Sequence, residues 1–75
     1  MKQNVINAFK KAADALYAIN WSETDVVEVR EVLLDNIGAD MILEEFYTLL
    51  ECLDKASFNK FQKMLIKTAI CELAS

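Results

Sequence analysis

Apolar residues recur along almost the whole chain at the spacing of an amphipathic α-helix, three or four positions apart. The strongest pattern spans residues 40–55. Its large apolar side chains lie on one side of a helical wheel, and Glu44, Glu45 and Glu51 lie on the other side. Asp40 provides a candidate N-cap, because a carboxylate accepts hydrogen bonds from the first turn of a helix. The pattern therefore predicts a helix over residues 40–55.

Three further segments repeat this spacing and predict helices over residues 2–19, 23–37 and 57–73. Ser22 is a candidate N-cap for the second of these helices. Gly38 suits the positive φ that often follows the last residue of a helix. Because the connections are short, we expect an all-α fold in which the whole chain forms one compact antiparallel bundle of about four helices.

Two residues do not fit a simple amphipathic pattern. Arg30 lies on the apolar side of the second predicted helix, between Val26 and Leu33. Either its guanidinium reaches water at the edge of the core, or it pairs with a carboxylate across a helix contact. Trp21 comes just before the predicted helix, so we expect it to pin the helix start by packing against Val26. The alternative is an exposed tryptophan at a binding surface.

The last predicted helix is apolar on more than one side. Its expected core stripe consists of Phe58, Phe61, Leu65, Ala69 and Leu73. A helix that is apolar nearly all round is buried in the core or against a second chain. We therefore predict a candidate self-interface that joins Arg30 to apolar residues of the last turns, namely Met64, Ile66, Ile70 and Cys71.

Charge is distributed unevenly along the chain, whose formal net charge is −4. Residues 21–54 hold ten acidic residues and one basic residue, whereas both ends of the chain are basic. The outward-facing carboxylates are candidate partner-binding residues, namely Glu28, Glu31, Asp35, Glu44, Glu45 and Glu51. Lys60, Lys63 and Lys67 form a candidate basic stripe on the last helix, for which a solvated face is the ordinary alternative.

The composition excludes several kinds of chemistry. Without histidine, the chain has no Ser-His-Asp or Cys-His nucleophile in the usual form and no Glu-x-x-His iron motif. One glycine is too few for a phosphate-binding glycine loop. The segment Gly38-Ala39-Asp40 resembles the start of the prosthetic-group helix of acyl carrier proteins, but Met41 stands where that family has its serine. We therefore expect no enzyme activity, no cofactor and no metal site.

The sequence also bears on location and on partners. No apolar run approaches the roughly 20 residues that span a bilayer, and the first residues do not resemble a secretion signal. We expect a cytoplasmic protein with Cys52 and Cys71 reduced, and no membrane association. The helix over residues 40–55 would repel phosphates, so we do not expect it to read DNA or RNA.

Two functions remain open. The first is a small acidic protein–protein interaction module, an inhibitor or adaptor that binds a larger partner through its acidic faces and spare apolar surface. In format alone it is similar to inhibitors encoded by phages and plasmids, including anti-CRISPR proteins. The alternative is a homodimeric helical regulatory protein with weak nucleic-acid contact through its lysine stripe.

Overall fold

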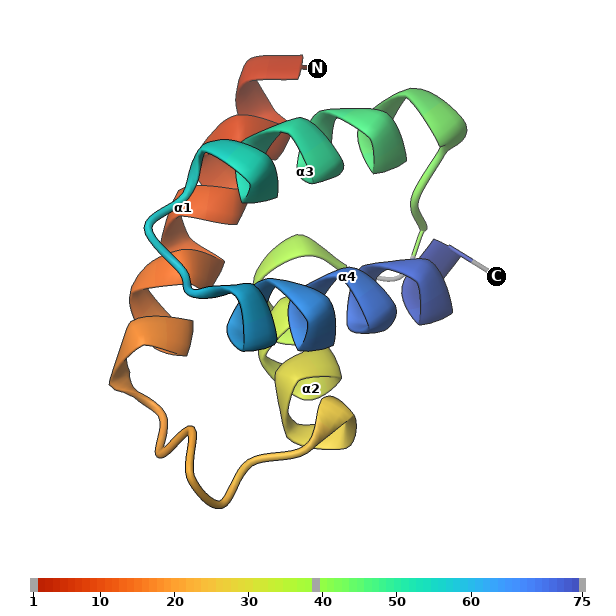
Figure 1. The fold of residues 1–75 in the computed structure, drawn as a ribbon. Helices are drawn as coiled ribbons and strands as arrows, with labels where there is room; N and C mark the ends of the chain where they lie inside the picture. Colours follow the sequence, from red (N-terminus) through yellow and green to blue (C-terminus); the bar gives the residue numbers. More distant parts are fainter. Residues whose placement is uncertain (1, 39, 75) are drawn as a thin grey trace.

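The computed structural model describes residues 2–38 and 40–74, which form four α-helices and, within these ranges, no strand (Figure 1). The helices are α1 (Lys2–Ala18), α2 (Val26–Ile37), α3 (Leu43–Lys55) and α4 (Lys60–Ala74). The helices pack against one another around a shared core. The prediction of a small all-α bundle is confirmed.

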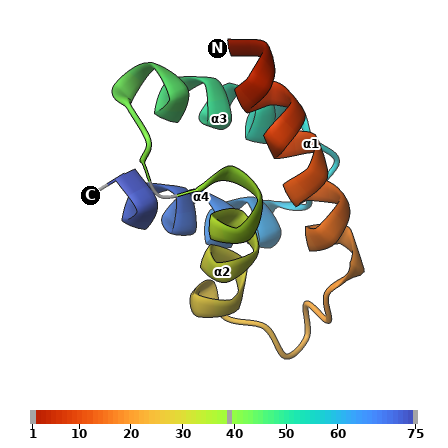
Figure 2. The same ribbon diagram turned by 180° about the vertical axis from the view of Figure 1, so that it is seen from behind.

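The bundle consists of two helical hairpins that cross each other. Helices α1 and α2 pack together, and so do α3 and α4, with the two members of each pair running in opposite directions (Figures 1 and 2). The hairpins meet where α1 packs on α3 and α2 packs on α4. In the described residues α2 and α3 make no such contact. The expectation that each pair of sequence neighbours packs together is therefore wrong for α2 and α3, because a five-residue connection carries the chain from one hairpin to the other.

All four helices contribute to one core. Its largest completely buried side chains are Leu16 of α1, Val29 and Leu33 of α2, Leu49 of α3, and Ile66 and Ile70 of α4. Ala12 and Ala69 are completely buried as well. Because alanine has a small side chain, these two positions let neighbouring elements approach closely.

Three helices begin three residues later than predicted. Asp25, not Ser22, caps α2, and its carboxylate accepts the backbone N–H of Glu28 at 3.1 Å. Asn59 and Gln62 cap α4 reciprocally, since each side chain accepts the other residue's backbone N–H, at 2.8 and 2.9 Å. This pair forms a capping box, which satisfies two backbone donors that the helix itself leaves unpaired.

The C-terminal end of α2 and the start of α3 are each marked by a hydrogen bond from a backbone N–H group. Gly38 has φ +90°, as the sequence predicts, and its backbone N–H donates to the carbonyl of Leu34 at 3.0 Å. Helix α3 begins after Ile42, whose backbone N–H donates to the Glu45 carboxylate at 3.1 Å. Ile42 occupies the N-cap position and Asp40 lies two residues before it, so the prediction of Asp40 as N-cap is wrong.

An aromatic cluster ties the end of α1 to the turn between α3 and α4. The rings of Tyr17 and Phe58 stack with centroids 4.4 Å apart, and Trp21 lies 6.1 Å from Phe58. The indole N–H of Trp21 donates to the backbone carbonyl of Leu16 at 2.8 Å. Trp21 is therefore a half-buried structural pin, but it holds the end of α1 and the buried Phe58, whereas the sequence predicts that it pins the start of the second helix through Val26.

The structure shows how Arg30, the other residue that does not fit the amphipathic pattern, is accommodated. Its guanidinium forms an ion pair with Glu72, which joins α2 to α4 across their contact. Both side chains remain 37% exposed, so water screens the pair and its contribution is about 0.2–1 kcal/mol. Of the two alternatives for Arg30, the pairing with a carboxylate is confirmed.

The burial pattern of α3 predicts a large difference between two leucines of one helix. We expect Leu49→Ala to lower the free energy of unfolding by about 2–5 kcal/mol, because Leu49 is completely buried and its loss leaves a cavity. Leu43→Ala is the matched control, since Leu43 is 67% exposed, and should change it by about 0.5 kcal/mol or less. Urea unfolding followed by circular dichroism measures both; equal losses would contradict this core.

The start of α4 provides a second test. We expect Asn59→Ala to lower the free energy of unfolding by about 1 kcal/mol, because it removes the side-chain acceptor of the capping box. Ser57→Ala should have little effect, since Ser57 is exposed and contributes its backbone N–H, not its hydroxyl, to the contact with Tyr17. A larger loss from Ser57→Ala would place the helix start where the sequence predicts it.

Candidate interaction surface

Most of the exposed large apolar side chains belong to the α3–α4 hairpin. Of eight such side chains in the described residues, five belong to α3, to the residue before it or to α4, namely Ile42, Leu43, Tyr47, Phe61 and Met64. Leu43 is 67% exposed and Met64 57% exposed. We call the outer surface of the α3–α4 hairpin that carries these residues the α3–α4 face.

The phase of each helix explains why these side chains face outward. In α3, Leu49 and Leu53 are buried, and Leu43 and Tyr47 lie on the opposite side, one helical turn apart. In α4, the side opposite to the buried residues Ile66, Ala69 and Ile70 carries Lys60, Met64, Lys67 and Cys71, which are all exposed. The hairpin therefore has an apolar inner side and a second, partly apolar outer side.

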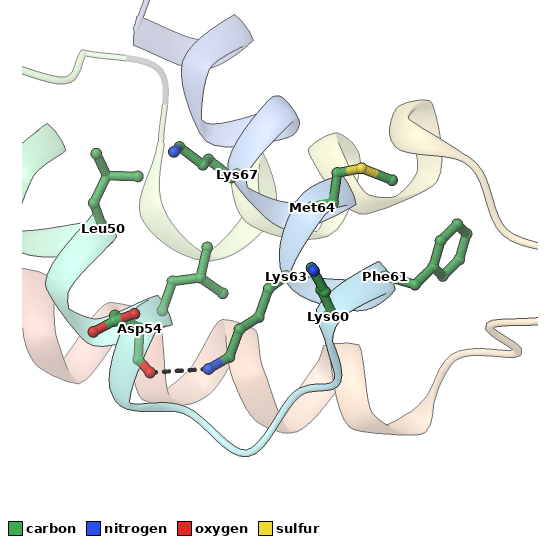
Figure 3. Close-up of a pocket in the computed structure, with 8 residues that line it drawn as sticks. Leu50, Asp54, Lys60, Phe61, Lys63, Met64 and Lys67 are labelled. Carbon is green, nitrogen blue, oxygen red and sulfur yellow. Dashed lines mark hydrogen bonds between the residues drawn. The ribbon is translucent and has the colours of Figure 1, made fainter.

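An open groove of about 800 Å³ runs along this face between α3 and α4. Leu50, Leu53 and Asp54 line it from α3, and α4 contributes Phe61 and Met64 together with Lys60, Lys63 and Lys67. Figure 3 shows Lys63 and Lys67 reaching from α4 toward α3, while Phe61 and Met64 lie on the other side of the α4 backbone. The groove thus combines apolar walls with ammonium groups at its edge.

Charges of opposite sign form two separate rows on the α3–α4 face. Helix α3 carries the exposed carboxylates Glu44, Glu51 and Asp54, whereas α4 carries Lys60 and Lys67. Lys63 is half-buried, and its ammonium donates to the backbone carbonyl of Asp54 at 2.9 Å. Within residues 2–38 and 40–74 no ion pair joins the acidic row to the basic row. Both rows are therefore available to another molecule.

The predicted acidic binding residues do not form one surface. Glu28, Glu31 and Asp35 are exposed on α2, while Glu44 and Glu51 are exposed on α3, which does not pack against α2. Glu45 is half-buried, and its carboxylate caps the first turn of α3. The structure therefore separates the six carboxylates into two groups and gives one of them a structural role. The sequence cannot reveal this separation, because it depends on the order in which the helices pack.

The candidate self-interface also divides. Ile66 and Ile70 are completely buried in the core of the chain itself, so they offer no surface to a second copy. Arg30 pairs with Glu72, whereas Met64 and Cys71 are exposed. Self-association itself stays a prediction, but Ile66 and Ile70 are not residues that carry it.

Phe61 is the functional candidate that the sequence pattern misplaces. It was expected in the core stripe of the last helix, yet it is 53% exposed on the α3–α4 face. The other members of that stripe are buried or half-buried, namely Phe58, Leu65, Ala69 and Leu73. Phe58 lies before the first residue of α4, so the helical spacing between Phe58 and Phe61 does not hold. Within α4, each step of four residues also advances by about 40° around the helix, so a stripe that begins at Leu73 and Ala69 drifts past Leu65 until Phe61 lies outside the buried side.

The chemistry of this face is suited to contact between molecules. Thioether and aromatic side chains adapt to an apolar partner surface, and the charged rows select its orientation. In the described residues no group of three or more histidine, cysteine, aspartate or glutamate side chains is placed to hold a metal ion. The expectations of no enzyme activity and no cofactor stay predictions.

Comparisons with known protein families, with curated proteins and with solved structures give no significant match to this chain. No helix in residues 2–38 and 40–74 has both the length and the apolar character needed to cross a membrane. The α3–α4 face is therefore the candidate site on its geometry alone.

Introducing a charged side chain at position 64 tests whether Met64 is exposed. We expect Met64→Glu to change the free energy of unfolding of the single chain by about 0.5 kcal/mol or less, because position 64 is on the surface and glutamate is a good helix former. Circular dichroism and urea unfolding at low protein concentration measure this. A loss of several kcal/mol would show that Met64 belongs to the core and would remove the α3–α4 face as a surface.

Proposed function

We propose that this chain is a protein–protein interaction module and that the α3–α4 face is its contact surface. The observation that carries the proposal is the concentration of exposed apolar side chains there, above all Leu43, Tyr47, Phe61 and Met64. Single exposed apolar residues are ordinary on protein surfaces, but a contiguous apolar patch with polar borders is typical of an interaction site. Aromatic side chains and methionine are also enriched in such sites.

The shape and charge of the face favour a protein over a lipid membrane or a nucleic acid. The groove hollows the face, and Leu50 and Leu53 line it. The flat surface of a bilayer would not contact residues inside a groove. The acidic row of Glu44, Glu51 and Asp54 would be repelled by anionic lipids and by phosphates. A folded protein with an apolar ridge and charges of both signs matches the face.

An inhibitor or an adaptor binds a partner without catalysing a reaction, and that is the role we propose. The exposed carboxylates of α2, namely Glu28, Glu31 and Asp35, form a second charged surface on a chain of net charge −4. Charge of one sign speeds encounter with a partner of the opposite sign, while apolar contacts slow dissociation. In this proposal the α3–α4 face holds the partner and the α2 carboxylates steer it.

Differential capture tests the proposal. Three tagged forms of the protein are immobilised, namely wild type, Met64→Glu and the control Leu34→Glu, whose substituted side chain is exposed on α2. They are exposed to an extract of the source cells that also contains an untagged copy of the chain. We expect at least one protein to be retained by wild type and by Leu34→Glu but reduced tenfold or more on Met64→Glu, because a buried charge lacks a partner at an apolar contact.

The control decides where the contact lies. The same proteins on all three baits, or none on any of them, would contradict the proposal. Loss on Leu34→Glu with full retention on Met64→Glu would place the contact on α2.

A further inference from the structure

We propose that the molecule seated on the α3–α4 face is the same face of a second copy of this chain. The result is a symmetric dimer with an intermolecular layer of four helices, two from each copy. This inference rests on the proposed function in its choice of the α3–α4 face and names the occupant of that face. Steering by the α2 carboxylates plays no part in it, because a second copy has the same net charge of −4. The apolar residues of the face, the symmetry of a dimer and the placement of charge support this dimer.

The exposed apolar residues of the α3–α4 face favour contact with a second layer of helices. Two packed helices that expose apolar side chains on their outer side are stable in water when another layer covers that side. Leu43 and Tyr47 of α3 and Phe61 and Met64 of α4 lie on this outer side. A second α3–α4 hairpin has the same length and the same apolar residues, so it covers the face without leaving part of it exposed.

Symmetry restricts how two such faces can meet. A twofold axis that lies in the interface and runs parallel to the helices places α3 of one copy over α4 of the other, in opposite directions. An in-plane axis perpendicular to the helices places α3 over α3 and α4 over α4. These are the two closed face-to-face dimers of an α3–α4 hairpin with its helices aligned.

Charge selects the first arrangement. Helix α3 carries Glu51 and Asp54, and α4 carries Lys60 and Lys67, all on the outer side. When α3 lies over α4 of the other copy, each acidic row faces a basic row on both sides of the axis. When like helices meet, carboxylates face carboxylates and ammonium groups face ammonium groups, which costs binding free energy.

The register agrees with this arrangement. Asp54 and Lys60 both line the groove at the end of the hairpin nearest the α3–α4 turn (Figure 3). An axis parallel to the helices does not change the height of any residue along the helix direction. Asp54 of one copy therefore comes level with Lys60 of the other. Glu51, about one turn from Asp54, comes level with the turn of α4 that holds Lys63 and Met64, whereas Lys67 lies about two turns from Lys60. Since each contact occurs twice, one apolar centre is bordered by two pairs of opposite charge.

A charge-reversal experiment tests the dimer. The solution mass of each protein is measured by light scattering after size exclusion, with reductant present, and the expected wild-type mass is twice the 8.5 kDa of one chain. The double variants Lys60→Glu/Lys67→Glu and Glu51→Lys/Asp54→Lys should each dimerise at least tenfold more weakly, because like charges then face each other. An equimolar mixture of the two should dimerise again, since each acidic row regains a basic partner.

Further variants fix the arrangement. The quadruple variant, which combines both reversals in one chain, should dimerise like wild type, because α3 and α4 simply exchange charge. Met64→Glu should yield a monomer, and the control Leu34→Glu on α2 should remain a dimer. Circular dichroism of every variant must show wild-type helix content, which is expected because the substituted side chains are exposed.

The remaining outcomes overturn the inference in distinguishable ways. A wild-type monomer at millimolar concentration, together with capture of another protein that Met64→Glu abolishes, would refute the dimer and leave the proposed function intact. A dimer that resists Met64→Glu and both charge reversals would refute the inference and the proposed surface together. A mass that increases without limit with concentration would show that the acidic α2 surface of one copy enters the groove of the next, since such contacts do not close.

Discussion

The whole structure depends on the burial of four short helices in one shared core. Helices of 12 to 17 residues are marginal in water when isolated, so each is stabilised by the neighbours it packs against. Leu16, Leu33, Leu49 and Ile66 are completely buried where the two hairpins cross. Because the hairpins cross, each helix contacts two others and has one side left over. That remaining side is the surface that each helix offers to another molecule.

On α3 and α4 the remaining sides lie next to each other, and this is what turns two ordinary helix surfaces into the α3–α4 face. An exposed leucine or methionine on an isolated helix would be unremarkable. Here one hairpin exposes Leu43 and Tyr47 on α3 and Phe61 and Met64 on α4, and rows of opposite charge accompany them. The interaction proposal and the dimer proposal use the same surface, and they differ in whether the partner is another protein or another copy of this one.

The sequence predicts the number, type and approximate extent of the helices because hydrophobic period is a local property. It places three helix starts too early, because Ser22, Asp40 and Ser57 are good caps locally. The hydrogen bonds at these three starts are made instead by Asp25, Glu45 and Asn59. For the site, the pattern predicts Met64, Lys60 and Lys67 at the surface, and the structure exposes all three, whereas Lys63 is half-buried. It misplaces Phe61 and Ile70, because a helix with apolar residues nearly all round does not reveal which side meets the core. The pattern also groups the carboxylates of α2 and α3 as one binding surface, although the crossing of the hairpins separates them.

The aromatic cluster has a consequence for observing this protein. Trp21 is the only tryptophan, and its indole is held between the last turn of α1 and the buried Phe58. Its emission therefore reports whether the first hairpin is docked on the turn that leads into α4. Because Trp21 does not line the groove, binding on the α3–α4 face would leave this emission largely unchanged, whereas separation of the hairpins would alter it. The chain thus carries an intrinsic optical probe that distinguishes loss of the fold from occupation of its surface.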